Sequence, residues 1–381
     1  MKNKNILILH SSNDLYGASK IFLQIIQILK NDGFEIHIVL PSKGPLDTII
    51  SQVKNIQVSY HSLGVLRKMY LNPMGLINRF IINIKAIKFL SNYIKSNSIE
   101  LVYTNTSTIL CGGIAARIND IPSIFHIHEI PIGNKLYEFL SGKIINKYSD
   151  KVLTVSDSVK SHWLKYINDK KIVRIYNGII LNETNSEIKL ERDQDDFVIT
   201  SVARIIPYKG HGYLIDIASE LLKKSKRFKF IIVGDTLPSY ASYEKSVKQK
   251  VKDLGLENQI KFLGFRNDVS SILKQSNLFI HSTTSPDPLP TVLFESLYYG
   301  VPTVATNLGG SIEILDNGNN GLLIPYNDPK KAANLINEYC SNNKLQKKHL
   351  ENSKKNFKIN FSPESFNKNI LKEVNVLLLN E

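Results

Sequence analysis

Short apolar runs alternate with longer segments of helical period along most of the chain. The first apolar run, residues 5–11, precedes a segment from Ala18 to Lys30 with the spacing of an amphipathic helix, and a second run follows at 35–41. This rhythm is typical of βαβ units, in which a helix connects two parallel strands. Further strands are predicted at 56–62, 100–105, 123–129, 151–156 and 171–178. Because the runs are apolar almost throughout, they indicate a parallel sheet covered on both faces.

The second half of the chain repeats this architecture. Strands are predicted at 196–205, 229–235, 259–265, 278–283, 302–307 and 321–327. Between the two series, residues 181–196 lose the apolar periodicity and gather polar and acidic side chains, as an interdomain linker does. A chain of 381 residues also exceeds the usual size of one domain. We therefore expect an N-terminal domain over 1–185 and a C-terminal domain over 186–361.

A final helix is predicted over 362–381. Ser362 supplies an N-cap, and Pro363 stands at the first helical position. The apolar face of this helix needs a partner, and it could pack on either domain, including back on the N-terminal one.

Composition narrows the function classes only a little. Apolar residues make up 43% of the chain and charged residues 22%, as in soluble globular proteins. Lysine and arginine outnumber aspartate and glutamate by 48 to 34, and the resulting charge of +14 favours anionic partners. Nucleotide phosphates, nucleic acid and an acidic membrane surface all qualify by charge. Because the sequence carries no nucleic-acid recognition motif, we expect no nucleic-acid partner.

The cysteines and the apolar runs bear on the compartment. Cys111 and Cys340 are far apart and have no CxxC spacing, which argues against a disulfide framework or a zinc site. The N-terminal apolar run is too short for a secretory signal, and no run reaches the roughly 20 apolar residues of a membrane span. We expect a cytoplasmic protein, with peripheral contact to the inner face of the cell membrane as an option.

An apolar helix predicted over 69–97 bears on that option. It carries Arg79, Lys85, Lys88 and Lys95. Such a helix could lie on an anionic membrane surface. It could equally be an ordinary domain helix whose cations face water.

In an open parallel sheet, ligands bind beyond the carboxyl ends of the strands, so the residues directly after each strand are the candidates. After the first strand, Gly17 stands where the next helix begins, and helix N-termini present open N–H groups that suit phosphate or sugar oxygens. The chain has no GxGxxG fingerprint at this position. That absence argues against a nicotinamide-dependent dehydrogenase.

A denser group of candidates lies in the second half. The strand over 196–205 ends in Arg204, and a short loop delivers Lys209 and Gly210 at the next helix start. These cations and open amides could neutralise a diphosphate leaving group. Asp287 and Glu295 follow a later strand, and the carboxylate of Glu295 could accept the two hydroxyls of a ribose. Farther on, Gly309 and Gly310 precede another helix and would offer backbone amides.

In this region the chain resembles the family 4 glycosyltransferases of GT-B fold. The resemblance is carried by Arg204 with Lys209 and Gly210, by the strand and loop over 262–269, by two acids with seven residues between them, and by the segments VPTVATNLGGSIEIL and NGLLIP. It covers most of residues 198–328, and the first half agrees more loosely. The resemblance implies an α/β protein with two Rossmann-like doubly wound parallel-sheet domains facing across a cleft.

The resemblance also implies an activity. The expected enzyme is a retaining glycosyltransferase that moves a hexosyl or N-acetylhexosaminyl group from a nucleoside-diphosphate sugar, most simply a UDP-sugar. The expected acceptor is a glycan or a lipid-linked sugar in bacterial surface polysaccharide synthesis, such as a capsule. Neither a metal ion nor another cofactor is expected.

Residue roles follow from the same resemblance. Arg204 and Lys209 would bind the donor diphosphate, and Glu295 would bind the ribose. Asp287 takes the first acidic position, where the family usually has Glu, so its side chain is one methylene shorter. The other donor-binding candidates are Phe265 and Arg266 near the base, Thr291, Val292, Gly309, Gly310 and Gly17.

The first half offers candidates near the reacting sugar. His126 and His128 alternate along one strand and therefore share a face of the sheet. A metal pair would need a third ligand, which the sequence does not show. His128 matches the histidine that the family places beside the reacting sugar, and His126 is expected in the core or wall. Asn105 and Glu129 are acceptor-side candidates, because both stand at strand ends.

Three other functions stay open at this stage. A GT-B nucleotide-sugar 2-epimerase would share the duplicated sheets and the anion site. A phosphorylase would need pyridoxal phosphate and its lysine, which we cannot locate in the sequence. A non-enzymatic module that binds anionic surfaces would use only the basic charge. For the transferase, the sequence shows no convincing nucleophile, so catalysis would depend on orientation and on charge stabilisation of the leaving diphosphate.

Overall fold

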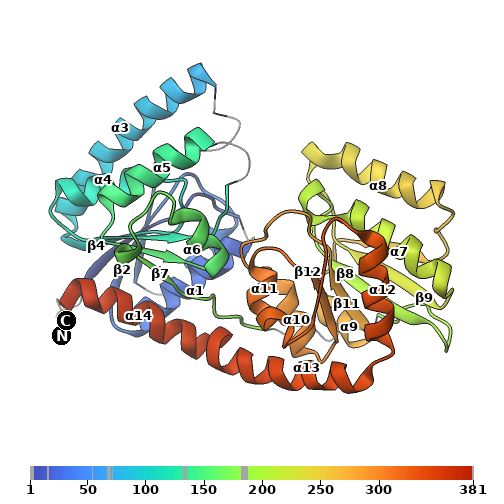
Figure 1. Cartoon of the computed structure of the whole chain (residues 1–381). Coiled ribbons are helices and arrows are strands. Elements are labelled where there is room, and N and C mark those ends of the chain that lie inside the picture. Colours follow the sequence, from blue (N-terminus) through green and yellow to red (C-terminus); the bar gives the residue numbers. More distant parts are fainter. Residues whose placement is uncertain are drawn as a thin grey trace. The chain divides into compact units, whose positions relative to one another are not determined.

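The computed structural model describes residues 4–14, 17–53, 55–66, 70, 72–131, 135–181 and 188–379, which form two α/β units (Figure 1). Unit 1 consists of Met1–Gly178 and Pro363–Glu381, and unit 2 consists of Ile179–Ser362. Part of the predicted linker, residues 182–187, lies outside the described residues.

Unit 1 is built on a parallel sheet in the order β3-β2-β1-β4-β5-β6-β7. Its strands are β1 (Asn5–Leu9), β2 (Glu35–Leu40), β3 (Ile56–Tyr60), β4 (Ile99–Thr104), β5 (Ser123–Ile127), β6 (Lys151–Thr154) and β7 (Ile172–Arg174). The strand order reverses direction between β1 and β4, which pair in parallel. The prediction of a buried parallel sheet is confirmed for this unit, and its switch point lies between β1 and β4.

Helices cover both faces of this sheet (Figure 1). They are α1 (Gly17–Asn31), α2 (Leu46–Ile50), α3 (Pro73–Ser96), α4 (Cys111–Ile118), α5 (Lys135–Tyr148), α6 (Asp157–Trp163) and the short 3₁₀ turn η2 (Asp169–Lys171). Side chains alternate along a strand, so the two faces have separate cores. Ile6 and Ile8 pack in the core that contains α1, whereas Leu7 and Leu9 pack in the core that contains α3 and α4.

The last helix, α14 (Pro363–Leu379), belongs to unit 1 although it follows the whole of unit 2 in the sequence. Phe366, Ile370 and Val374 are spaced four residues apart, so they share one helix face. These side chains are at most 1% exposed and pack in the same core as α1. The apolar face of the predicted final helix therefore has its partner in unit 1.

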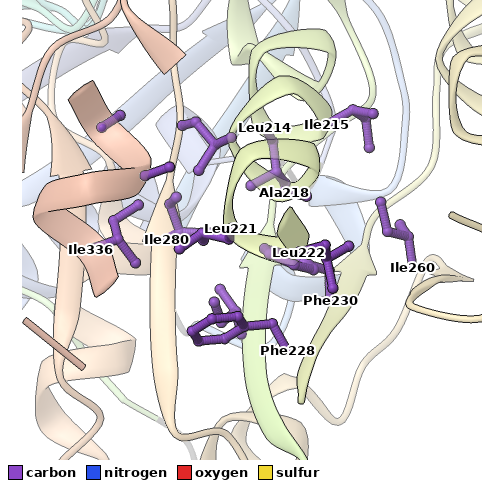
Figure 2. Close-up of a cluster of buried hydrophobic side chains, with 14 of the residues drawn as sticks. Leu214, Ile215, Ala218, Leu221, Leu222, Phe228, Phe230, Ile260, Ile280 and Ile336 are labelled. Atoms are coloured by element: carbon purple, nitrogen blue, oxygen red, sulfur yellow. The ribbon is translucent and has the colours of Figure 1, made fainter. Parts of the chain in front are cut away.

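Unit 2 is built on a second parallel sheet, in the order β10-β9-β8-β11-β12-β13. Its strands are β8 (Phe197–Val202), β9 (Phe228–Val233), β10 (Ile260–Gly264), β11 (Leu278–His281), β12 (Thr303–Thr306) and β13 (Leu322–Ile324). This order reverses direction between β8 and β11. Figure 2 shows the main core of the unit, in which Leu214, Ala218 and Leu221 of α7 (His211–Lys224) lie beside Phe230 and Ile280 of the sheet.

The remaining helical elements of unit 2 cover the sheet and connect its strands. They are η3 (Pro207–Lys209), η4 (Pro238–Tyr240), α8 (Ala241–Asp253), α9 (Val269–Lys274), α10 (Thr291–Tyr298), α11 (Gly310–Ile314), η5 (Asp316–Gly318), α12 (Pro329–Cys340), α13 (Asn343–Asn356) and the π-helical turn η6 (Phe357–Phe361). No helix within the described ranges is both long enough and apolar enough to cross a membrane.

One helix boundary differs from its prediction. The helix expected over 69–97 begins at Pro73, because the side chain of Asn72 caps it by accepting a hydrogen bond from the Gly75 N–H. Proline at the first helical position fits this start, since its missing N–H would have no partner there. Of the segment before the helix, residues 67–69 and 71 lie outside the described part of the chain.

Candidate functional site

The unit 2 candidates gather at the carboxyl ends of β8 and β11, the switch point of that sheet. The chain leaves β8 through Arg204 and η3, which ends at Lys209. The loop after β11 is bound to this turn, because the Thr284 N–H and the Thr283 hydroxyl both donate to the carbonyl of Tyr208, at 3.1 Å and 2.7 Å. The open ends of neighbouring strands at a switch point are where parallel α/β sheets bind ligands.

Gly210 allows these two loops to approach each other. Its φ is +73°, and a Cβ at this position would lie 1.9 Å from the carbonyl oxygen of Ser282. No side chain fits in that space, and an L-residue rarely adopts that backbone conformation. Glycine at 210 therefore lets Lys209 lie beside the loop that follows β11.

The central feature of this site is an ion pair between Lys209 and Asp287. Lys209 Nζ bonds Asp287 Oδ2, and the side chains are 22% and 12% exposed. His281, the last residue of β11, has its Nε2 3.3 Å from the same oxygen, without hydrogen-bond alignment. Burial would raise the pKa of Asp287, but the Lys209 ammonium holds it well below its usual range. Asp287 is therefore a carboxylate that orients Lys209.

His281 was not a predicted site residue. Burial lowers its pKa, so the ring is neutral at neutral pH. The only sequence signal for it is its position at the end of a strand beside the switch point. That position becomes informative once β11 is known to pair with β8.

Gly309 and Gly310 pack against the Asp287 loop, and this packing occupies the amide of Gly310. The N–H of Gly310 donates to the carbonyl of Asp287 at 2.8 Å. At Gly309, whose φ is +58°, a Cβ would lie 2.4 Å from that carbonyl oxygen. The expectation of a free amide at Gly310 is corrected here, because this N–H already has a backbone partner. The two glycines instead hold Asp287 in place.

Glu295, Thr291 and Val292 share one face of α10. Residues three and four apart in a helix are neighbours, and all three side chains are partly exposed. The other face of α10 is buried, with Leu293 and Phe294 at 0% and 2% exposure. Helix geometry therefore turns the predicted ribose-binding acid away from the core.

Phe265 and Arg266 follow β10, at the same edge of the sheet as the switch point. The Phe265 side chain is 66% exposed. Arg266 forms a two-point ion pair with Asp268, with Nε 2.8 Å from Oδ1 and Nη2 2.5 Å from Oδ2. The charge of Arg266 is balanced by this neighbour, whereas the Phe265 ring offers an accessible aromatic surface.

The unit 1 candidates meet at the carboxyl ends of β1, β4 and β5. Asn105, which follows β4, has its Oδ1 2.8 Å from His128 Nε2 and its Nδ2 3.2 Å from His10 Nδ1. Asn105 and His10 are each 1% exposed. His10 was not predicted, and its only sequence signal is its place directly after β1. The structure thus brings Asn105 and His128 into direct contact and adds His10, which the pattern does not single out.

Glu129 binds the loop after β4. Its carboxylate accepts hydrogen bonds from the Thr106 hydroxyl at 2.6 Å, from the Ser107 N–H at 3.3 Å and from the His128 N–H at 3.2 Å. Burial raises the pKa of Glu129, and these hydrogen bonds oppose that rise. Glu129 therefore fixes the loop after β4. The same hydrogen bonds occupy the carboxylate oxygens that would otherwise bind an acceptor.

His126 lies in the core, as expected. It is fully buried, its Nδ1 lies 2.8 Å from the Tyr103 hydroxyl, and its ring centroid is 4.3 Å from that of His128. Burial lowers the pKa of His126 to about 3. Among the described residues, no group of three His, Cys, Asp or Glu side chains could hold a metal ion. Gly17 is the first residue of α1, after residues 15 and 16, which are outside the described set.

Relatives of the chain are glycosyltransferases. It is 24% identical over 363 residues to the UDP-Gal:alpha-D-GlcNAc-diphosphoundecaprenol alpha-1,3-galactosyltransferase of Escherichia coli, which covers 86% of this chain and 89% of the relative. An uncharacterized glycosyltransferase of Methanocaldococcus jannaschii is 28% identical over 369 residues, covering 89% of this chain and 88% of that protein.

Solved structures share the fold. Anabaena HepE in complex with UDP-glucose superposes with a TM-score of 0.77 at 25% identity, covering 97% of this chain and 99% of HepE. The family models match both halves of the chain: Glycosyltransferase Family 4 over residues 16–183 and Glycosyl transferases group 1 over residues 182–356. The chain therefore belongs to the family 4 glycosyltransferases, and it is a transferase of the GT-B fold.

Proposed function

We propose that this glycosyltransferase moves a hexosyl or N-acetylhexosaminyl group from a UDP-sugar to a glycan or lipid-linked acceptor in bacterial surface polysaccharide synthesis. The E. coli relative carries UDP-Gal and a diphosphoundecaprenol-linked sugar in its name, and HepE was solved with UDP-glucose. The Vi polysaccharide biosynthesis protein of Salmonella typhi is 30% identical over 183 residues, which are 45% of this chain. These names support a UDP-sugar as the donor and surface polysaccharide synthesis as the pathway.

The observation that carries the proposal is the Lys209–Asp287 ion pair at the switch point of unit 2. When the bond between the anomeric carbon and the phosphate breaks, negative charge grows on the diphosphate. An oriented ammonium stabilises that charge without reorganisation at the moment of reaction. Arg204, on the same loop as Lys209, would supply a second cation. We expect these side chains to act without a metal ion, so transfer should persist in a chelator.

The anomeric configuration is retained if the bond to the acceptor forms on the same face of the sugar from which the diphosphate leaves. The acceptor oxygen bonds to the anomeric carbon on the face that the diphosphate leaves, and the acceptor proton passes to a phosphate oxygen. The products are then the glycosylated acceptor and UDP. Asp287 is engaged with Lys209 and His281, which does not favour it as a nucleophile.

The exposed face of α3 supports a membrane-bound acceptor. The apolar face of α3 consists of Met74, Ile77, Phe80, Ile81 and Ile84, which are 83%, 62%, 67%, 48% and 52% exposed. This helix contains no acidic residue and carries Arg79, Lys85, Lys88 and Lys95. Exposed apolar side chains together with uncompensated cations are what an anionic lipid surface binds.

Vesicle sedimentation tests this surface. The full chain should sediment with phosphatidylglycerol vesicles and much less with phosphatidylcholine vesicles, and Phe80→Glu with Ile84→Glu should abolish the difference. Ile359→Glu is the matched control, because Ile359 is 68% exposed and lies in unit 2. Equal binding by the double variant and the control would contradict the role of α3.

The reaction is tested by incubating the protein with UDP-sugars, with and without a lipid-linked sugar acceptor, and identifying the products. We expect acceptor-dependent release of UDP and an α- or β-linkage that matches the donor anomer. Release of UDP with a 2-epimer of the sugar and no acceptor would instead indicate an epimerase. Glu295→Ala should mainly weaken donor binding, and Lys209→Ala should mainly lower kcat. Equal loss of donor binding in both variants would refute that division.

A further inference from the structure

We infer that a directional chain of hydrogen bonds from Asp14 through Ser19, His10 and Asn105 fixes the tautomer of His128, so that its Nδ1 is a hydrogen-bond acceptor. All five residues belong to unit 1. They lie at and beyond the carboxyl ends of β1, β4 and β5, and each contact between neighbours in the chain is 3.2 Å or shorter. Asp14, Ser19, His10 and Asn105 would thus be positioning residues for His128.

The direction of the chain is set at its carboxylate end. Ser19 Oγ lies 2.9 Å from Asp14 Oδ1. An ionised carboxylate only accepts, so Ser19 uses its single hydroxyl proton on Asp14. Ser19 Oγ also lies 3.1 Å from His10 Nε2. Because the hydroxyl proton is already committed, Ser19 must accept at this contact, and His10 carries its proton on Nε2.

The side-chain amide of Asn105 then carries the donor-to-acceptor direction of the hydrogen bonds from His10 to His128. Burial lowers the pKa of His10 to about 4, so the ring has only one proton at neutral pH and its Nδ1 is a bare acceptor. Asn105 must present its NH₂ group to that nitrogen, at 3.2 Å. Its carbonyl oxygen consequently faces His128 Nε2, at 2.8 Å. An oxygen that can only accept requires His128 to carry a proton on Nε2.

Nδ1 of His128 is then left with a lone pair. Burial and the neighbouring rings of His126 and His10 hold the pKa of His128 well below its usual range, which keeps the ring neutral. A neutral imidazole can accept a hydrogen bond from a sugar hydroxyl and does not repel the positive charge that develops on a sugar ring during transfer. This role of His128 rests on the proposed function, whereas the tautomer does not.

The tautomers can be read directly by long-range ¹⁵N–¹H correlation spectra of the full chain labelled with ¹⁵N-histidine. The chain has 9 histidines, and His10→Gln and His128→Gln variants assign two of them. We expect both to be neutral with the proton on Nε2 at pH 7. A His128 signal with its proton on Nδ1, or an imidazolium signal, would overturn the inference.

Asn105→Asp is the sharpest perturbation, because it is isosteric and replaces a donor with an acceptor. His10 Nδ1 would then face an oxygen, so we expect His10 to gain a proton on Nδ1. Ser19→Ala is a second variant that removes the acceptor at His10 Nε2, and it should give a mixture of His10 tautomers. Asn83→Asp on α3 is the matched control, because within the described ranges the Asn83 amide donates to the backbone carbonyls of Gly64 and Arg79. Unchanged His10 signals in Asn105→Asp and Ser19→Ala would refute the chain.

Kinetics separate this inference from the proposed function. Asn105→Asp should lower kcat roughly tenfold or more while leaving the Kd for UDP unchanged, since Arg204, Lys209 and Glu295, the main contacts proposed for UDP, lie in unit 2. Expected tautomers with an unchanged kcat would overturn the role of His128 in transfer. A wild-type protein with the expected tautomers but no transferase activity on any UDP-sugar would contradict the proposed function and leave the hydrogen-bond chain standing.

Discussion

Lys209 and Asp287 are 78 positions apart in the sequence and share one partly buried ion pair. The sequence indicated both residues, because each follows a predicted strand, but it did not predict that their side chains contact each other. Their mutual contact depends on β11 lying next to β8, which strand patterns alone do not reveal. At the scale of single residues, the structure therefore makes Asp287 the partner that holds Lys209.

Removal of the lysine should expose the strength of this pair. Lys209→Ala leaves a largely buried carboxylate without its cation, so we expect the free energy of unfolding to fall by about 3 kcal/mol at pH 7. The folded-state pKa of Asp287 is depressed in the wild type, so the pair stabilises the protein above the unfolded pKa of about 3.9 and loses that effect as the pH falls toward the folded value. The difference between variant and wild type should therefore keep nearly its full value down to about pH 4 and shrink below it.

Urea denaturation at pH 7, at pH 4 and below pH 3 measures this difference in the free energy of unfolding. Lys223→Ala is the control, because Lys223 pairs with Glu220 at 66% exposure and its loss should change stability by less than about 0.5 kcal/mol. A Lys209→Ala variant as stable as this control at pH 7 would show that the pair is not holding the loops together.

The elements themselves were largely predictable from the sequence. Most strands of the two described sheets lie on runs of apolar residues, because a strand covered on both faces has no polar side to interrupt the run. The pattern could not predict which residues the side chains at the strand ends contact. His10 and His281 each stand at the end of a strand, and only the neighbouring strand decides what they face. The prediction of a free amide at Gly310 was wrong for the same reason, because the partner of this N–H, the Asp287 carbonyl, lies on a loop distant in the sequence.

Glycine at a loop crossing gives a prediction at the scale of elements. Gly210 and Gly255 both have positive φ, but a Cβ at Gly210 would strike the Ser282 carbonyl, whereas one at Gly255 would meet nothing within 4 Å. Gly255→Ala should cost about 1 kcal/mol for its backbone conformation alone. Gly210→Ala should cost roughly 3 kcal/mol and should also lower kcat, because the clash moves Lys209. Denaturation curves with steady-state transfer kinetics compare the two, and equal effects would mean that the crossing tolerates a methyl group.

At the scale of the whole molecule, the chain returns to unit 1 after completing unit 2. Phe366 on α14 is 1% exposed and lies in the core of unit 1 with α1. The stability of the first unit therefore depends on residues beyond position 362, which were predicted as a helix but not assigned to one domain by the pattern. The apolar face of a helix can be recognised in a sequence, whereas the surface on which it packs is set by the tertiary structure.

Phe366→Ala should destabilise unit 1 by about 3 kcal/mol, because it leaves a cavity in a closed core. UDP binding should stay unchanged, since the proposed contacts are in unit 2. Hydrogen exchange followed by mass spectrometry should show faster exchange in β1 and α1 and unaltered exchange in β8 and α7. Faster exchange spread equally over both units, or a loss of UDP affinity, would contradict this assignment of α14.

The most direct test of the proposed donor site is calorimetric titration of UDP, GDP, ADP and dTDP into the wild type, Glu295→Ala and Glu338→Ala. Glu338 is an exposed acid on α12 and serves as the matched control. We predict that UDP binds the wild type and Glu338→Ala with the same Kd, and that Glu295→Ala binds it roughly tenfold more weakly through the lost ribose contacts. No binding of any of the four nucleotides to the wild type, or equal affinity in all three proteins, would contradict a nucleoside-diphosphate site in unit 2.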